Sequence, residues 1–299
     1  WQKSLVRRDG LALGKIVEQS EELCLESVRH NWFSLSLVKK QTHEICMEAV
    51  QIDGFALSYV ERQTPEICME AVQQDGMALQ FVKNKTPNIC VAALQQNGMA
   101  LEYVDEQNSE LCMLAVQGNG NALKWAKKQT PAICMEAVQQ DSYNLRYAEV
   151  QTREICKEAV RQDGLALQYV HAQNAEICME AIKNNPDSLY YVEDQTPEIC
   201  KEATTRDGYV LQYVREQTPE ICSAAVGENG LALRYVREQT PDVCMCAVHE
   251  NGNALRDVNE QTLEICMAAV EKNQNLMHYV DAEFLPEVNR AMDEESIKW

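Results

Sequence analysis

Apolar residues recur along the chain in short clusters that fit one face of an α-helix. In the stretch QTPEICMEAVQQDG at residues 63–76, Ile67, Cys68, Ala71 and Val72 are spaced i, i+1, i+4 and i+5. This spacing places them on one side of a helix, while polar side chains occupy the other sides. The pattern predicts an amphipathic helix that starts after Thr64.

Capping residues mark where this helix begins and where a second one follows. Thr64 can cap the first helix, Pro65 suits its first position, and Glu66 lies near the positive end of the helix dipole. Asp75 and Gly76 end it and start a second, shorter helix. That second helix directs three apolar residues inward: Ala78, Leu79 and Val82.

The whole pattern repeats with a period of 22 residues. The residue seven after each in-register cysteine is Asp or Asn in all twelve copies, and the residue five before it is Gln in eleven. The in-register cysteines are Cys24, Cys46, Cys68, Cys90, Cys112, Cys134, Cys156, Cys178, Cys200, Cys222, Cys244 and Cys266.

Helices of roughly 11 and 8 residues are too short to be stable alone in water, so neighbouring repeats must bury them. The period therefore predicts an all-α fold, an α-solenoid of about twelve two-helix repeats whose handedness the sequence leaves open. We expect one array over residues 1–282, with an N-terminal half-repeat at 1–18, and a C-terminal cap and tail at 283–299.

Composition points to a folded acidic protein. The 299 residues include 27 Lys plus Arg and 46 Asp plus Glu, a net charge of −19, and 45% are hydrophobic. No apolar run approaches the roughly 20 residues that span a bilayer. We expect a soluble cytoplasmic protein that does not enter membranes.

We expect the in-register cysteines to be free thiols that pack as small buried side chains. Equivalent helices packed side by side would hold successive cysteines roughly 9 Å apart, beyond the Cα separation of about 7 Å that a disulfide allows. A shared zinc ion would need the sulfurs closer still. A row of free thiols favours a reducing compartment. Cys246 alone is out of register, on the outer face, and we expect it to be the reactive thiol.

Nothing in the sequence nominates an active site, a metal site or a cofactor. The five histidines occupy five different columns of the repeat. Gly118 and Gly120 begin like a phosphate loop, but Leu123 stands where the motif requires glycine. We therefore expect a protein that is not an enzyme.

Three further columns have structural interpretations. An acidic residue stands two before the cysteine in ten repeats, as at Glu44 and Glu66, where it suits a helix start. The Gln column is expected to bond backbone groups at the turns. The column thirteen after the cysteine is aromatic in ten repeats, as at Tyr59 and Tyr213, which is typical of packing between repeats.

Positions that differ between repeats are candidates for recognition. Two such columns lie nine and twelve residues after each cysteine, on one face of the second helix. They predict a binding groove along the repeats, although apolar residues there could instead join neighbouring turns. The candidate partner-binding residues are Phe33, Phe55, Met77, Met99, Tyr143, Leu165, Tyr209, Leu231, Arg146, Tyr190, Arg234 and Arg256.

We therefore expect a non-enzymatic scaffold whose groove binds a protein or peptide. The alternative is an acidic decoy that mimics nucleic acid and captures a basic protein, which the charge of −19 permits. Direct binding of DNA or RNA ranks third, because phosphate contacts require clusters of Lys and Arg.

The repeat also resembles a known family. The unit L-x-Y-V-x-x-Q-T-P-E-I-C-x-x-A-V-x-x-D-G-x-A occurs at residues 57–78 and again at 211–232, where Asn229 replaces the aspartate. It resembles the short helical repeats catalogued as domain of unknown function 4116, over roughly residues 5–282. The resemblance implies an all-α repeat fold and no established activity. Because the family occurs in bacteria that secrete effectors, it also admits delivery into a host cytosol.

Overall fold

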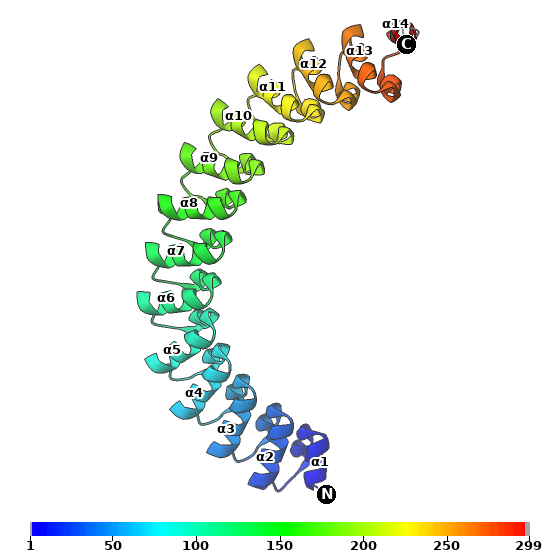
Figure 1. Cartoon of the computed structure of the whole chain (residues 1–299). Coiled ribbons are helices and arrows are strands. Elements are labelled where there is room, and N and C mark those ends of the chain that lie inside the picture. The colour runs from blue at the N-terminus through cyan, green and yellow to red at the C-terminus, as the bar shows by residue number, and fades with distance from the viewer. Residues whose placement is uncertain (1, 297–299) are drawn as a thin grey trace. The chain divides into compact units, whose positions relative to one another are not determined.

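The computed structural model describes residues 2–296, and these residues form α-helices and 3-10 helices without any β-strand. The chain divides into two compact units, residues 1–155 and 156–299. Helix α8 (Arg153–Gln162) contains the boundary between them. In each unit the α-helices form one row and the 3-10 helices form a second row beside it (Figure 1). The predicted all-α repeat fold is confirmed.

The first unit is a run of α-helices, each followed by a 3-10 helix labelled η. Its elements are α1 (Gln2–Arg8), η1 (Gly10–Lys15), α2 (Glu21–His30), η2 (Trp32–Leu37), α3 (His43–Ile52), η3 (Gly54–Tyr59), α4 (Pro65–Gln74), η4 (Gly76–Phe81), α5 (Pro87–Gln96), η5 (Gly98–Tyr103), α6 (Ser109–Gly118), η6 (Gly120–Trp125), α7 (Pro131–Gln140) and η7 (Ser142–Tyr147). Residues 2–15 thus contribute both an α-helix and a 3-10 helix ahead of the first complete repeat.

The second unit continues the same alternation and ends on a longer α-helix. Its elements after α8 are η8 (Gly164–Tyr169), α9 (Ala175–Asn184), η9 (Pro186–Tyr191), α10 (Pro197–Arg206), η10 (Gly208–Tyr213), α11 (Pro219–Glu228), η11 (Gly230–Tyr235), α12 (Pro241–Glu250), η12 (Gly252–Asp257), α13 (Leu263–Lys272), η13 (Gln274–Tyr279) and α14 (Leu285–Ser296). The terminal helix α14 lies within the predicted cap and packs on α13.

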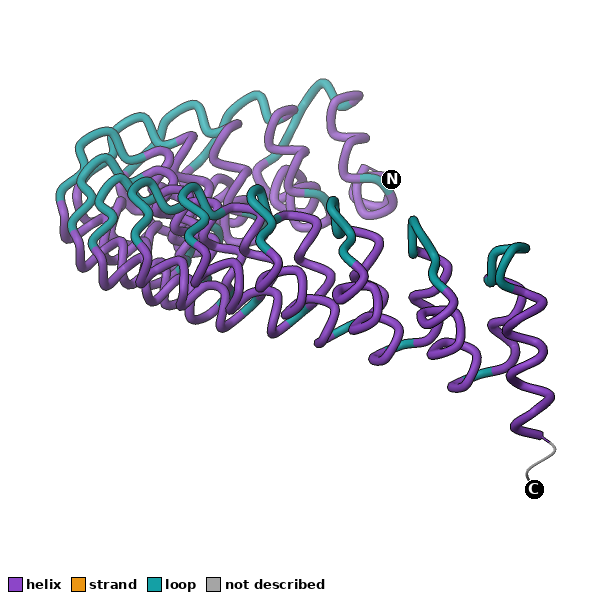
Figure 2. Tube along the Cα trace, turned by 90° about the horizontal axis from the view of Figure 1, so that it is seen from above, coloured by secondary structure: helices purple, strands orange, loops and turns teal. Residues whose placement is uncertain are grey.

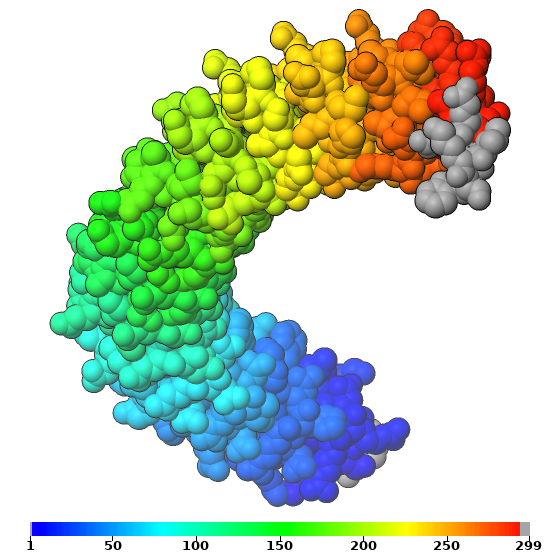
Figure 3. Space-filling model, turned by 45° about the horizontal axis from the view of Figure 1, so that its top comes forward, coloured from blue at the N-terminus to red at the C-terminus, as the bar shows by residue number. Residues whose placement is uncertain are grey.

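Within each unit, contacts between elements join each repeat to its neighbours in sequence, as α3 joins α4 and η10 joins η11. The space-filling view shows each unit as a continuous band in which successive repeats touch (Figure 3). The loops that follow the 3-10 helices gather along one edge of each unit (Figure 2). A repeat is therefore stabilised mainly by the repeat before and the repeat after it.

The predicted capping residues act at both helix starts. The Thr64 hydroxyl accepts a hydrogen bond from the backbone N–H of Ile67 (3.4 Å), and α4 begins at Pro65. The Asp75 carboxylate accepts from the backbone N–H of Met77 (2.9 Å), which starts η4. These side chains satisfy N–H groups that have no partner inside the helix.

The second helix of each repeat is a six-residue 3-10 helix, shorter and more tightly wound than the sequence suggested. Three residues per turn place Gly76, Leu79 and Val82 in one line, and all three are buried. A methyl group on Gly76 would lie 2.4 Å from the carbonyl oxygen of Ala93 in the next α-helix. Glycine recurs here because the next repeat packs directly against this backbone.

The glutamine column bonds backbone groups at the turns, as expected. The side-chain nitrogen of Gln63 donates to the carbonyl oxygen of Phe81 (2.8 Å), and its oxygen accepts from the backbone N–H of Lys83 (3.0 Å). Gln195 and Gln217 make the same pair of contacts in the second unit. Each such glutamine ties one turn to the turn of the following repeat.

Candidate functional site

The two variable columns occupy the second and fifth positions of each 3-10 helix. Because 3-10 helices have three residues per turn, positions two and five share a face, separate from the buried line of Gly76, Leu79 and Val82. In η4 this face carries Met77 and Gln80, and the Gln80 amide donates to the carbonyl oxygen of Met77 (3.0 Å). We call this face of the 3-10 helices the variable stripe and describe it separately in each unit.

The predicted residues differ in how far they reach solvent. Tyr190 is the most exposed aromatic among them, with 62% of its surface accessible, and Phe33 follows with 41%. The other exposed members are Arg146, Arg234 and Arg256. The seven half-buried members are Phe55, Met77, Met99, Tyr143, Leu165, Tyr209 and Leu231.

Several apolar stripe residues are half-buried because they pack against the aromatic column of the next repeat. Phe55 meets Phe81 edge-to-face with ring centroids 5.6 Å apart. Tyr209 meets Tyr235 in the same way at 6.1 Å. Such contacts join neighbouring turns, so these side chains support the stack as well as forming its surface.

Two cations in the first unit lie over rings of the aromatic column. The Nζ atom of Lys124 is 4.6 Å from the ring centroid of Trp125, and the Arg146 guanidinium carbon is 4.6 Å from that of Tyr147. In each pair the cation occupies position five of the 3-10 helix and the ring position six. The aromatic column next to the stripe therefore already accommodates positive charge from stripe residues.

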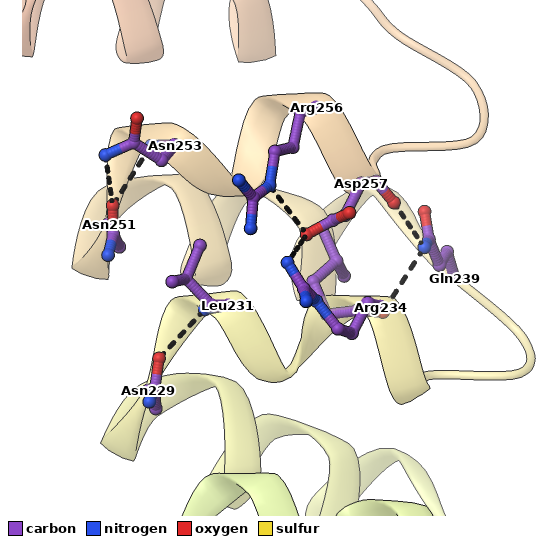
Figure 4. Close-up of polar contacts among 9 residues, drawn as sticks. Asn229, Leu231, Arg234, Gln239, Asn251, Asn253, Arg256 and Asp257 are labelled. Atoms are coloured by element: carbon purple, nitrogen blue, oxygen red, sulfur yellow. Dashed lines mark hydrogen bonds and ion pairs between the residues drawn. The ribbon is translucent and has the colours of Figure 1, made fainter.

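In the second unit, two predicted arginines converge on one carboxylate. Asp257 takes the place of the usual aromatic residue, and its Oδ2 atom lies 3.2 Å from Arg234 and 3.5 Å from Arg256 (Figure 4). The other stripe residue of this 3-10 helix, Asn253, is polar, and its side-chain nitrogen donates a hydrogen bond to Oδ1 of Asn251 (3.1 Å). Arg234 is thus held by the following repeat, whereas Arg256 pairs within its own 3-10 helix.

Four cavities among the described residues lie along the loop edge, which the sequence did not single out. They sit between the starts of successive α-helices and reach Cys46, Cys68, Cys90 and Cys222. The cavity at Cys222 has a volume of about 230 Å³ and is also lined by Pro219 and Arg237. None of the four is lined by a predicted stripe residue. The recurrence of small Thr and Cys columns next to each turn is the only sequence signal for them.

The thiols beside these cavities are poor nucleophiles. The twelve in-register cysteines are buried, and Cys246 is half-exposed. Burial, with the carboxylate of Glu61 nearby, raises the pKa of Cys46 to about 11. The thiol donates a weak hydrogen bond to the Oε1 atom of Gln41, which lies 3.6 Å from the sulfur. A protonated, hydrogen-bonded thiol suits packing better than covalent chemistry.

Acidic side chains have local partners as well. The backbone N–H of Glu66 and the Thr64 hydroxyl hold the pKa of Glu66 below its usual value, as expected at a helix start. Between neighbouring α-helices, Arg29 pairs with Glu48 (2.8 Å) and Arg161 with Glu180 (3.0 Å). In the described residues, no group of three His, Cys, Asp or Glu side chains is placed to hold a metal ion.

Comparison with known proteins identifies a family of which the repeat is characteristic. Residues 42–87, 64–108, 152–196 and 174–218 match the model of the family described as Domain of unknown function (DUF4116). The resemblance drawn from the sequence is confirmed over residues 42–108 and 152–218, with two overlapping matches in each half of the chain. No curated protein matches the chain. None of the helices in the described part is both long enough and apolar enough to cross a membrane.

Proposed function

We propose that this protein is a non-enzymatic scaffold whose variable stripe binds a protein or peptide segment. The observation that carries the proposal is the contrast between columns. The buried Leu and Cys positions hardly change from repeat to repeat, whereas the stripe presents Phe33, Met77, Arg146 and Tyr190 in turn. A surface that varies on a constant framework is typical of recognition by repeat proteins.

The chemistry of the stripe supports a protein or peptide partner. Aromatic residues, Met and Arg are the side chains most enriched in protein interfaces, and they supply most of the binding energy where they are exposed. An extended partner could contact several repeats, one 3-10 helix after another. Such distributed binding needs no deep cavity, which agrees with the position of the four cavities at the loop edge.

We place this function in a reducing compartment, the cytoplasm or a host cytosol into which the protein is delivered. Twelve buried thiols recurring at one position of the fold suit such a compartment. The acidic-decoy alternative rests on the charge of −19 alone. It is weaker because part of that charge, at positions such as Glu66 and Glu48, caps helices or pairs with arginine inside the array.

The test is selection of peptides from a displayed random library on the immobilised protein, followed by measured affinities for the stripe variant with Phe55→Ala and Met77→Ala. We expect at least about a tenfold loss of affinity, or about 1.4 kcal/mol. Met69→Ala, which truncates a half-buried methionine in the α-helix row, is the control and should leave binding unchanged.

Salt separates the two candidate functions. Binding through apolar stripe contacts should persist between about 50 mM and about 300 mM salt, whereas a charge decoy would release its basic partner over that range. Selected peptides that bind the stripe variant and the Met69→Ala protein equally well would show that the stripe is not the binding surface.

A further inference from the structure

In the second unit, an aromatic and acidic cluster combines residues of the variable stripe with rings of the aromatic column. Its centre is Tyr190, at position five of η9, whose ring meets Tyr191 edge-to-face at 5.1 Å and Tyr213 at 5.4 Å. The interplanar angles are 87° and 72°. Three rings at steep angles present π faces in different directions around one exposed side chain.

A carboxylate stands beside these rings. Asp187 is exposed at position two of η9, one 3-10 turn before Tyr190. Burial raises the pKa of the Tyr213 phenol, and the charge of Asp187 raises it further, ahead of smaller effects from Tyr235 and Tyr190. The negative charge of Asp187 therefore acts on the Tyr213 phenol, one of the three rings of the cluster.

In the first unit, equivalent aromatic rings bind positively charged side chains. At the equivalent positions of η6 and η7, the cations of Lys124 and Arg146 lie 4.6 Å from the rings of Trp125 and Tyr147. In η9 the fifth position is itself a tyrosine. Compared with η6 and η7, η9 thus keeps an aromatic ring at position six and has a carboxylate at position two. Its fifth position carries a tyrosine ring in place of the cation.

Arginines from the neighbouring repeats are engaged elsewhere. Arg206 pairs with Glu202 (2.7 Å), and Arg215 donates to the carbonyl oxygens of Glu193 (2.7 Å) and Val192 (3.0 Å). Arg234 pairs with Asp257 (3.2 Å). These three arginines therefore bind groups outside the cluster, and a partner can supply the cation that complements it.

We propose that Asp187, Tyr190 and Tyr213 form a receptor for one cationic side chain of a bound peptide, with arginine preferred over lysine. A guanidinium can stack on a tyrosine ring while donating two hydrogen bonds to a carboxylate, whereas an ammonium acts as a point charge. The net charge of −19 also attracts a basic segment. The proposal rests on the proposed function, and it specifies the chemistry of the partner at this site.

The experiment compares two fluorescein-labelled Gly/Ser peptides by anisotropy at about 150 mM salt, where long-range attraction is screened. One peptide carries a single pair of arginines, and the other carries citrulline at both places, which keeps the shape and removes the charge. We expect the arginine peptide to bind about three- to tenfold more tightly than the citrulline peptide. A lysine peptide should fall between them.

Variants then locate the effect. Tyr190→Ala and Asp187→Asn should each reduce the affinity for the arginine peptide about three- to tenfold, while Tyr190→Phe, which keeps the ring, should retain it. Glu271→Gln makes the same change of charge at an exposed position of α13 and should have no effect. Far-ultraviolet circular dichroism and urea unfolding confirm that each variant is folded.

The outcomes separate this proposal from the proposed function. If Asp187→Asn and Glu271→Gln change arginine binding equally, or if the citrulline peptide binds as well as the arginine peptide, the receptor proposal is wrong. Library peptides that still depend on Phe55 and Met77 would then leave the scaffold function standing. Arginine binding that depends on Tyr190, with no library peptide sensitive to the stripe variant, would support the receptor and contradict the extended binding surface.

Discussion

The side-chain amide of Gln63 donates a hydrogen bond to the carbonyl oxygen of Phe81, 2.8 Å away in the next repeat. The same amide accepts one from the backbone N–H of Lys83 (3.0 Å). One side chain thereby satisfies two backbone groups where the chain leaves its 3-10 helix. Turns in this fold have no sheet or helix ladder of their own, so the glutamine column provides the missing partners.

We predict that Gln63→Leu destabilises the protein by about 2 kcal/mol, because two backbone groups lose their partners while remaining partly shielded from water. Urea unfolding followed by circular dichroism measures the change. Gln80→Leu is the control, since the exposed Gln80 amide bonds only within its own 3-10 helix, and it should change stability by less than about 0.5 kcal/mol. Equal effects of the two variants would contradict the role of the glutamine column.

Two glycines of successive repeats should respond in opposite directions to alanine. A methyl group at Gly208 would lie 2.3 Å from the carbonyl oxygen of Ala225, whereas one at Gly227 meets nothing within 4 Å. We expect Gly208→Ala to destabilise by more than about 2 kcal/mol, because backbone would have to move. Gly227→Ala should stabilise by about 0.5 to 1 kcal/mol through helix propensity.

Thermal unfolding of both variants decides the matter. A destabilised Gly227→Ala protein would show that α11 does not tolerate a side chain there. A Gly208→Ala protein as stable as the wild type would mean that neighbouring repeats do not approach as closely as the structure places them.

Thiol labelling should distinguish Cys246 from the other cysteines. It is half-exposed on α12, whereas the twelve in-register thiols are buried. With a maleimide at neutral pH, we expect one thiol to react at least about tenfold faster than the rest, which require local opening. Cys246→Ser should abolish the fast phase, and mass spectrometry of the labelled peptide should identify the site. A fast phase that persists in this variant would contradict the prediction.

Alkaline pH should destabilise the fold through its buried thiols. Burial raises the pKa of Cys46, Cys178 and Cys266 to about 11, whereas a thiol in an unfolded chain ionises near pH 8.5. Between these values the unfolded chain releases protons that the folded chain retains. The free energy of unfolding therefore holds its full value below about pH 8.5 and falls as pH rises toward 11.

The control for this prediction is the triple variant with Cys46→Ala, Cys178→Ala and Cys266→Ala. Its absolute stability will be lower because of lost packing, but urea unfolding at several pH values should give a shallower fall with pH than in the wild type. Identical slopes would show that these three thiols do not cause the alkaline sensitivity.

The repeat pattern sufficed to predict most of the local structure. Thr64, Pro65 and Glu66 are sufficient to start α4, and Asp75 caps the following helix by a contact within two residues. The glutamine contacts could also be anticipated, because a polar column at a turn needs backbone partners. In contrast, the type of the second helix was not evident, since a six-residue amphipathic run fits α and 3-10 geometry equally well.

The candidate site was predicted less completely. Sequence variation identified Tyr190 and Phe33 as surface residues, and the structure places them among the most exposed aromatics. It could not show that Phe55 packs against Phe81, or that Arg234 pairs with Asp257, because these contacts join residues in different repeats. Whether the stripe binds a partner stays a prediction.

The sequence by itself determined the helices, their caps and the buried columns, because each depends on residues only a few positions apart and is repeated twelve times. Only the tertiary structure decided which side chains of adjacent repeats meet. That choice depends on how closely one backbone approaches the next, as where Ala225 leaves no room for a side chain at Gly208. It also decided that Asp187, Tyr190 and Tyr213 share one surface, because side chains from successive turns come together only when the repeats are stacked.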